Sequence, residues 1–161
     1  MSADKKPGIG IVVIGGSVRP GCRQKDRMKP VLDGIKETAL YVDDLKRARA
    51  FYEKVFGLKV LDEDDRFCAL SVADQHVLLL FKRGASRKAV SVPGGTIPGH
   101  DGSGQSHVGF AVSAASLKAW EKRLKKHGVK IEGRMKWWRG GSSLYFRDPD
   151  GHLLELLTPK V

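Results

Sequence analysis

The side chain with the clearest chemical meaning in this sequence is Glu155, which lies inside the apolar run LLELL. The surrounding segment, SLYFRDPDGHLLELLTPK (143–160), has the pattern of two strands joined by a tight turn. A carboxylate buried in such a strand costs several kcal/mol unless it is paired or holds a metal ion. The sequence therefore predicts that Glu155 marks a site.

One pattern of secondary structure occurs twice after residue 34. A strand-like segment is followed by apolar residues at helical spacing from Leu45 to Val55, then by Gly57 and further strand-like runs, and the second half repeats this order. The pattern predicts an α+β fold built from a duplicated β-α-β-β-β module. The expected strands are 35–42, 58–63, 67–72, 76–82, 106–112, 129–133, 135–138, 142–147 and 152–157, and the second helix is expected over 115–127.

The expected strands and helices set the limits of the folded domain. Residues 1–34 lack an amphipathic period and are interrupted by Gly and Pro, so we expect a flexible basic extension there. The folded domain is expected over 35–161, with module 1 at about 35–83 and module 2 at about 106–159. The 84–105 segment has no clear period and is interpreted as a linker loop that can close over a ligand site.

Strand alternation predicts which side chains share a face. Because successive residues of a strand point to opposite faces, the apolar set of each strand covers the helix and the other set is left free. Glu37 and His107 then occupy equivalent places in the two modules, and Leu79 is the equivalent of Glu155. If the modules pack side by side, their free faces form a trough that holds Glu37, His107 and Glu155.

Three segments carry a resemblance to a known family: TALYVDDLKRARAFYEKVFGLKV, SHVGFAV and SLYFRDPDGHLLEL. Together they resemble the vicinal oxygen chelate superfamily, which contains glyoxalase I, extradiol dioxygenases, fosfomycin-resistance thiol transferases, methylmalonyl-CoA epimerase and bleomycin-binding resistance proteins. The resemblance covers residues 35 to about 159. It implies a glyoxalase-like fold, in which two tandem β-α-β-β-β modules form a curved mixed sheet around a central trough.

The resemblance implies a divalent metal ion held by Glu37, His107 and Glu155. The fourth ligand of glyoxalase I falls on Leu79, which cannot bind metal, and this argues against a glyoxalase I reaction. Two carboxylates and one imidazole suit Mn, Fe or Mg and tolerate Zn or Ni, so the ion is not distinguished. Open coordination positions can then hold vicinal oxygens of a substrate. The catalytic candidates are Glu37, Glu155 and Tyr145.

Other residues are candidates for substrate contact. Tyr41 and Tyr145 share the free-face parity and can donate hydrogen bonds, or they can be packing residues. Of the adjacent Trp137 and Trp138, alternation predicts one in the core and one against the trough or an interface. The remaining candidates are His100 in the linker loop and Arg147. We interpret the turn 148–151 and His152 as structural.

Two classes of function fit these residues. The first is a metal-dependent lyase, isomerase, dioxygenase or thiol transferase acting on a small oxygenated molecule. The second is a metal-free binding protein of the bleomycin-resistance kind, in which His107 and Glu155 simply pair. In either case we expect an anionic or aromatic small ligand and a homodimer.

Composition narrows the class of partner and the compartment. Two distant cysteines and the lack of a long apolar run favour a cytoplasmic protein without a membrane segment. The net charge of +11 is shared between the extension and the solvated helix segment 122–130, and no nucleic-acid motif accompanies it. Nucleic acid is therefore not the expected partner.

Overall fold

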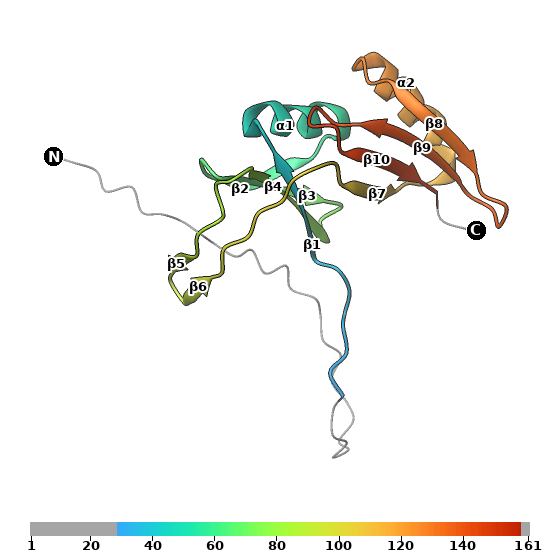
Figure 1. The fold of residues 1–161 in the computed structure, drawn as a ribbon. Helices are drawn as coiled ribbons and strands as arrows, with labels where there is room; N and C mark the ends of the chain where they lie inside the picture. The colour runs from blue at the N-terminus through green and yellow to red at the C-terminus, as the bar shows by residue number, and fades with distance from the viewer. Residues whose placement is uncertain (1–28, 159–161) are drawn as a thin grey trace.

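The computed structural model of the chain describes residues 29–158, which form two modules side by side (Figure 1). Most of the predicted extension lies outside these residues, and 29–36 has no regular secondary structure. No helix within 29–158 combines the length and apolar character needed to cross a membrane. The strands are β1 (Glu37–Val42), β2 (Lys59–Glu63), β3 (Phe67–Val72), β4 (His76–Lys82), β5 (Val90–Val92), β6 (Gly95–Ile97), β7 (His107–Ala111), β8 (Ile131–Lys136), β9 (Ser142–Arg147) and β10 (Leu153–Leu157), and the helical elements are α1 (Leu45–Phe51), a π-helical turn η1 (Tyr52–Phe56), a 3-10 turn η2 (Ala114–Ser116) and α2 (Leu117–Lys126).

The two modules have the same sheet topology, which confirms the predicted duplication. Module 1 has the strand order β1-β4-β3-β2 and module 2 has the order β7-β10-β9-β8. In each module the first strand pairs in parallel with the last, and the other pairs are antiparallel. A helix covers one face of each sheet, so the other face is free for a site, as the alternation predicts (Figure 1).

Two details differ from the sequence prediction. The segments 129–133 and 135–138 were expected as separate strands, but they form the single strand β8, whose register shifts between Ile131 and Gly133. A bulge of this kind breaks the alternation and hides the continuity of a strand. The linker loop 84–105 also contains a short hairpin, β5 and β6, whose strands of three residues are too brief to show a period.

The apolar core lies on the helix side of the sheets and runs through both modules. Leu40 and Leu80 of module 1 and Leu154 of module 2 are fully buried, as their parity predicts. The ring of Phe56 in η1 lies 4.9 Å from that of Phe110 and 6.0 Å from that of Phe146, both in module 2. The helical segment α1–η1 therefore packs against both modules.

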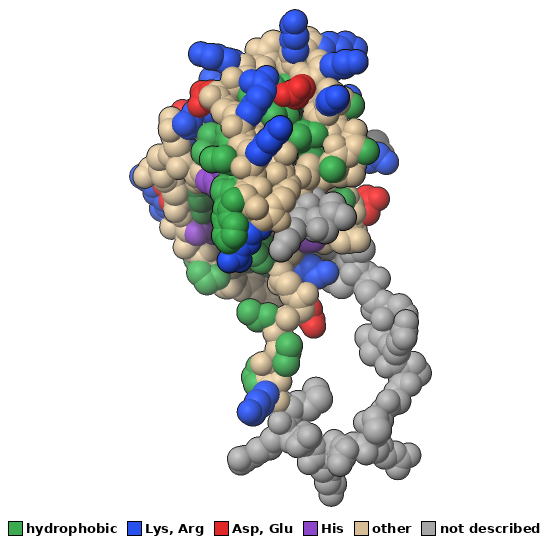
Figure 2. Space-filling model, turned by 90° about the vertical axis from the view of Figure 1, so that its right-hand side faces the viewer, with side chains coloured by type: hydrophobic (Ala, Val, Ile, Leu, Met, Phe, Trp, Pro, Cys, Tyr) green, Lys and Arg blue, Asp and Glu red, His purple; other side chains and the backbone are tan. Residues whose placement is uncertain are grey.

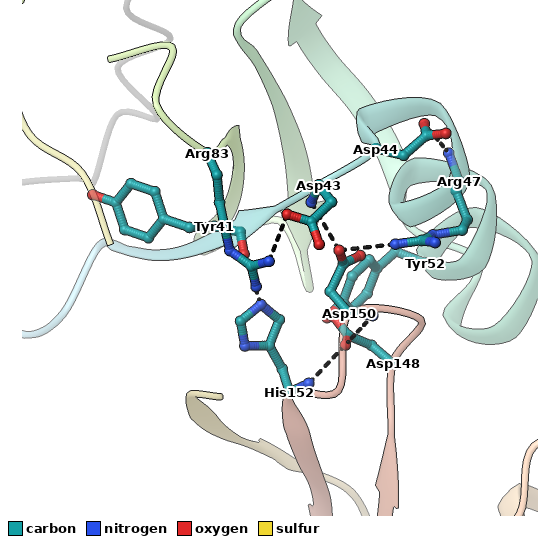
Figure 3. Close-up of polar contacts among 9 residues, drawn as sticks. All are labelled: Tyr41, Asp43, Asp44, Arg47, Tyr52, Arg83, Asp148, Asp150 and His152. Atoms are coloured by element: carbon teal, nitrogen blue, oxygen red, sulfur yellow. Dashed lines mark hydrogen bonds and ion pairs between the residues drawn. The ribbon is translucent and has the colours of Figure 1, made fainter. Parts of the chain in front are cut away.

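A buried polar joint holds module 2 against module 1 at the turn between β9 and β10 (Figure 3). Asp148 Oδ2 accepts from the Tyr52 hydroxyl at 2.9 Å, and its Oδ1 accepts from the backbone N–H groups of His152 and Asp150 at 2.8 and 3.0 Å. Asp150 Oδ1 in turn accepts from the N–H of Asp43 at 2.8 Å and from Arg47 at 2.9 Å. Burial and the nearby Asp148 raise the pKa of Tyr52 well above its usual value, so the phenol remains a donor.

His152 completes the joint. Its Nδ1 lies 3.0 Å from the N–H of Ser106, which can only donate, and its Nε2 lies 3.0 Å from the carbonyl oxygen of Tyr41, which can only accept. These two partners require a neutral ring with its proton on Nε2. The predicted structural interpretation of the turn and of His152 is confirmed by these contacts, because the imidazole connects β1 to the start of β7.

We predict that Asp148→Ala lowers the free energy of unfolding by about 2–3 kcal/mol, because it leaves the buried Tyr52 hydroxyl and two N–H groups without an acceptor. Urea unfolding at a fixed protein concentration measures the change. Asp65→Ala is the matched control, since Asp65 is exposed in the turn between β2 and β3 and takes no part in the joint, and it should change stability by less than about 0.5 kcal/mol. Equal midpoints for the two variants would show that the joint contributes nothing.

Candidate functional site

The free face of module 2 brings together His107 and Glu155, two of the three predicted metal ligands. His107 Nε2 lies 3.2 Å from Glu155 Oε2, and the His107 side chain is about half exposed while that of Glu155 is 10% exposed. The parallel register places Glu155 opposite Gly109. A Cβ at Gly109 would lie 2.9 Å from Leu157 and 3.8 Å from Glu155 Oε2, so glycine keeps the space beside the carboxylate open.

Tyr145 extends this group from the neighbouring strand. It is paired with Glu155 in the antiparallel register of β9 and β10. Burial of its ring raises the pKa of Tyr145, and its hydrogen bond to Glu155 raises that pKa further, so the phenol is protonated at neutral pH. The His107 and Tyr145 ring centroids are 6.4 Å apart. His107, Tyr145 and Glu155 thus form one open-faced cluster of an imidazole, a phenol and a carboxylate.

The tryptophan pair departs from its prediction, because neither ring lies in the core. Both residues follow β8, where strand alternation no longer applies. Trp137 is 44% exposed and Trp138 is 83% exposed. Trp137 Nε1 donates to Ser143 Oγ at 2.8 Å, which places its ring beside the module 2 face. Ser143 was missed from the sequence, although it shares the parity of Tyr145 and Glu155.

Arg147 lies on β9 with Ser143 and Tyr145, but its guanidinium is occupied by contacts with other residues of the chain. Its guanidinium contacts Glu132 at 3.1 Å, the Gln105 side chain at 2.9 Å and the carbonyl oxygen of Gly151 at 2.6 Å. These contacts tie β8, the end of the linker loop and the β9–β10 turn together. A substrate contact for Arg147 stays a prediction, and the described contacts give it a positioning role.

The free face of module 1 carries the remaining candidates around a cavity of about 690 Å³. Glu37, Ala39 and Tyr41 of β1 line it, together with Leu79, the predicted equivalent of Glu155. His100 of the linker loop also lines it, and its Nδ1 lies 2.7 Å from the Tyr41 hydroxyl oxygen. The sequence placed Tyr41 and His100 as separate candidates, and only the folded loop pairs them.

The linker loop is anchored over this cavity. The N–H of His100 donates to the carbonyl oxygen of Ser86 at 2.8 Å. Asp101 accepts from Arg87 at 2.6 Å and from the N–H of Gly84 at 3.0 Å, and these hydrogen bonds lower the pKa of Asp101 to about 2. Gly102 packs so closely on the Tyr41 ring that a Cβ would come within 2.4 Å of it. The loop is therefore held in a defined conformation, as a wall of the cavity.

The three predicted ligands do not meet within one chain. His107 and Glu155 lie on the module 2 sheet, whereas Glu37 lies at the start of β1 in the other sheet. Accordingly, residues 29–158 contain no group of three or more His, Cys, Asp or Glu side chains arranged to hold a metal ion. Although the modules lie side by side, a single trough that holds all three predicted ligands is thus not formed within residues 29–158.

The donor atoms of module 2 nevertheless fit a divalent ion. Metal bonds of about 2.0–2.2 Å to nitrogen and oxygen place two neighbouring donor atoms about 3.0–3.5 Å apart. The separation of His107 Nε2 from Glu155 Oε2, 3.2 Å, falls in this interval. The His107 side chain is about half exposed, so this pair is open to a third ligand.

Part of the surplus positive charge lies on α2, on the helix side of the module 2 sheet. Lys122, Lys125 and Lys126 of α2 are exposed, as predicted for a solvated helix face. Figure 2 shows lysine and arginine side chains gathered toward the end of the molecule that carries α2. Because α2 covers the helix side of its sheet, this charge lies on the side of the sheet opposite to His107 and Glu155.

Comparison with known proteins identifies the family. The model of the glyoxalase/bleomycin resistance protein/dioxygenase superfamily matches residues 34–156. The chain belongs to this superfamily. A curated relative, the metallothiol transferase FosB of Bacillus licheniformis, is 32% identical over 129 residues, which is 80% of this chain and 77% of the relative.

Further similar proteins agree with this assignment. The glutathione transferase FosA of Serratia marcescens is 28% identical and spans 78% of this chain and 81% of its own. Among solved structures, the lactoylglutathione lyase of Agrobacterium tumefaciens is 34% identical, with a TM-score of 0.74, and covers 82% of this chain and 97% of its own. The glyoxalase-like fold and the predicted family are both confirmed. The two transferases and the lyase are 28–34% identical in sequence to this chain.

We predict that Glu155→Gln lowers the pKa of Tyr145, because the carboxylate charge no longer opposes the phenolate. The pKa should stay above the ordinary tyrosine value of about 10, since burial of the ring is unchanged. The ring carbon shifts of ¹³C-labelled tyrosine, followed by NMR against pH, measure the titration. Glu132→Gln, which removes a carboxylate of the same sheet that contacts Arg147, should leave the Tyr145 titration in place. An identical shift in both variants would remove Glu155 as the cause.

Proposed function

We propose that this protein is a divalent-metal-dependent enzyme that acts on a small oxygenated molecule, and that it works as a homodimer. The observation that carries the proposal is the 3.2 Å separation of His107 Nε2 and Glu155 Oε2 on an open face. The relatives add support, because the FosB proteins similar to this chain are named metallothiol transferases. Among the reactions of the superfamily, the names of these relatives favour transfer of a thiol to the substrate.

Glu37 supplies the third ligand in this proposal, from a second copy of the chain. Within one chain Glu37 lies on the other sheet, but it is exposed at the edge of the module 1 cavity and has no hydrogen bond or ion pair with another side chain in residues 29–158. A two-fold dimer that places module 1 of one copy against module 2 of the other makes two identical sites. Each site then contains Glu37, His107 and Glu155.

The residues around the site have distinct roles in the proposed reaction. A bound divalent ion supplies Lewis-acid stabilisation of charge that develops on a substrate oxygen. The carboxylates of Glu37 and Glu155 balance the formal charge of the ion. His107 contributes one imidazole nitrogen as the third ligand. Tyr145, which keeps its proton, can exchange its hydrogen bond to Glu155 for one to the substrate oxygen. Trp137 forms a wall that limits water access from one side.

The substitution at the fourth ligand position separates this chain from glyoxalase I. Leu79 stands where the last strand of module 2 carries Glu155, and its aliphatic side chain lines the module 1 cavity. Three ligands leave more open positions for a chelating substrate than four do. The proposal therefore assigns the chain a transferase-like or dioxygenase-like site.

A second candidate function is metal-free binding of a small molecule. Two observations favour it: His107 and Glu155 already lie within pairing distance, and a cavity of about 690 Å³ exists in module 1 alone. A protein of this kind needs no third ligand and would sequester an anionic or aromatic compound. Metal content distinguishes it from the enzyme.

We predict that the purified, untagged protein binds one divalent ion per chain and that Glu37→Ala and Glu155→Ala each lose it. Elemental mass spectrometry after purification without chelator measures the content and the identity of the ion. Glu132→Gln is the matched control and should retain the ion. A wild-type protein that takes up no added Mn, Fe, Zn, Ni or Mg would favour the metal-free binding function.

A mixed dimer tests the shared site directly. A dimer of one Glu37→Ala chain and one Glu155→Ala chain, purified through two different tags, has one site with both substitutions and one intact site. We expect it to recover half of the wild-type metal content, although neither parent dimer binds metal. No recovery would show that all ligands come from the same chain and would contradict the proposed arrangement.

A further inference from the structure

The floor of the module 1 cavity consists of residues from β1, β3 and β4, which the strand register arranges in three rows. These rows are Glu37 and Val77, then Ala39, Leu79 and Ala69, and then Tyr41, Phe81 and Phe67. Because a strand rises about 3.3 Å per residue, the Cα atoms of Glu37 and Tyr41 are about 13 Å apart. The floor therefore has an acidic end, an aliphatic middle and an aromatic end.

The charge of this floor is confined to the acidic end. Within residues 29–158, Glu37 is the only charged residue that β1, β3 and β4 contribute to the lining. The other charged lining residues come from β2, the β2–β3 turn and the linker loop, and they are Asp62, Arg66 and Lys88. In the proposed function the metal ion lies at Glu37, so the oxygen atoms of a substrate bind at that end. The floor from Ala39 onward is left for an uncharged part of the ligand.

Four rings gather at the other end of the cavity, and we refer to Tyr41, Phe67, Phe81 and His100 as the four-ring group. The ring centroid of Phe81 lies 5.9 Å from that of Tyr41, 6.0 Å from that of Phe67 and 4.5 Å from that of His100. All four residues line the cavity and are only partly buried. Aromatic rings associate by offset stacking or edge-to-face contact at such separations, so the group offers a place for one more ring.

The phenol of the four-ring group already has a hydrogen-bond partner. The Tyr41 hydroxyl oxygen lies 2.7 Å from His100 Nδ1. Burial raises the pKa of Tyr41, and the charge of Asp101 raises it further, so the phenol keeps its proton at neutral pH. A ligand group that packs on these rings gains by burying apolar surface, and it does not have to supply a hydrogen bond to Tyr41.

Apolar side chains also border the cavity. Leu61 of β2 is 37% exposed and Ile97 of β6 is 42% exposed, and both line it. Apolar surface gathered in a concavity is typical of ligand sites, and the volume of about 690 Å³ lies in their usual range of roughly 300–1,000 Å³. A ligand confined to the Glu37 end would leave the middle and aromatic rows uncovered.

We propose that the four-ring group is a subsite for an aryl tail of the substrate, whose oxygenated head lies at the Glu37 end. The inference rests on the proposed function, because it takes the metal ion held by Glu37 as the site of the head. It deepens that function to a substrate class, in which an apolar chain joins an oxygenated head to an aromatic ring. The small side chains of Ala39 and Ala69 leave room for the chain over the middle row.

Two matched hydroxamic acids test the subsite on protein that has been treated with a chelator and dialysed. Isothermal titration calorimetry compares 6-phenylhexanohydroxamic acid with hexanohydroxamic acid, which has the same head and chain but no ring. We expect the phenyl compound to bind at least about tenfold more tightly, since its ring buries apolar surface against the four-ring group. Equal affinities would overturn the aryl subsite.

Variants locate the ring. Phe81→Ala should reduce the difference between the two compounds to less than about threefold. Ala39→Phe, at an exposed position of the lining, should weaken both compounds at least about tenfold by filling the middle row. Thr38→Phe is the matched control, because Thr38 is exposed on the same strand but does not line the cavity, and it should leave both affinities unchanged. A ring advantage that survives both Phe81→Ala and Ala39→Phe would place the ring elsewhere and overturn the inference.

Protein loaded with its divalent ion tests the position of the head. The phenyl compound should bind more tightly to the loaded protein than to the chelator-treated protein, and the ring advantage should persist. Glu37→Ala should remove the gain from the metal and keep the ring advantage. A ring advantage that disappears on loading would show that head and ring are not held together, which contradicts the proposed substrate class.

Metal content and ring advantage are separate readouts, so the two proposals fail separately. A wild-type protein that binds a divalent ion but shows no ring advantage overturns the aryl subsite and leaves the metal-dependent enzyme standing. A wild-type protein that takes up no ion but shows a ring advantage that Phe81→Ala removes supports the subsite. In that case the metal-dependent enzyme fails, and the metal-free binding function keeps the aryl ligand.

Discussion

The buried carboxylate of Asp148 is the contact on which the arrangement of this protein depends. It accepts three hydrogen bonds where module 2 meets the helical segment of module 1, and one of its donors, Tyr52, is itself fully buried. His152 adds a neutral imidazole between the Ser106 N–H and the Tyr41 carbonyl oxygen. Because such buried polar groups tolerate few alternative geometries, they set how one module lies against the other.

That relation separates the chemistry of the two modules. The free face of module 2 has two potential ligands and a protonated phenol, and the free face of module 1 has a mainly apolar cavity whose lining includes Glu37 and Asp62. Each face alone has an incomplete set of groups for metal-assisted chemistry. In the proposed two-fold dimer, unlike faces would meet twice, and a duplicated module would make a site without symmetric residues.

The duplication also shows how the two copies have diverged. At the position of Glu155 module 1 has Leu79, and at the position of the DPDG turn it has the sequence ADQ, in which Ala73 and Asp74 have left-handed backbone angles. Module 1 lacks the buried aspartate that makes the joint, and its last strand lines an apolar cavity. The result is one free face lined mainly by apolar residues and another that carries the polar groups His107, Tyr145 and Glu155.

Much of the fold was predictable, because it depends on local patterns. Alternation over β1, β7, β9 and β10 predicted their helix-facing and free residues, and glycines at 57 and 128, both with positive φ, marked the helix ends. The same alternation placed Tyr145 and Glu155 on one face. It failed at β8, where a register shift interrupts it, and at Trp137 and Trp138, which lie in a turn and follow no period.

The sequence by itself thus determined the strands, the helices and the parity that puts Glu37, His107 and Glu155 on free faces, because each of these follows from spacing along the chain. The tertiary structure alone decided which of these faces meet. It brought His107 to Glu155 and left Glu37 apart, it folded the linker loop so that His100 pairs with Tyr41, and it left the Ser86 hydroxyl without a hydrogen-bond partner among residues 29–158. These are contacts between residues distant in the chain, and they depend on the packing of the joint and the loop, which has no periodic signal.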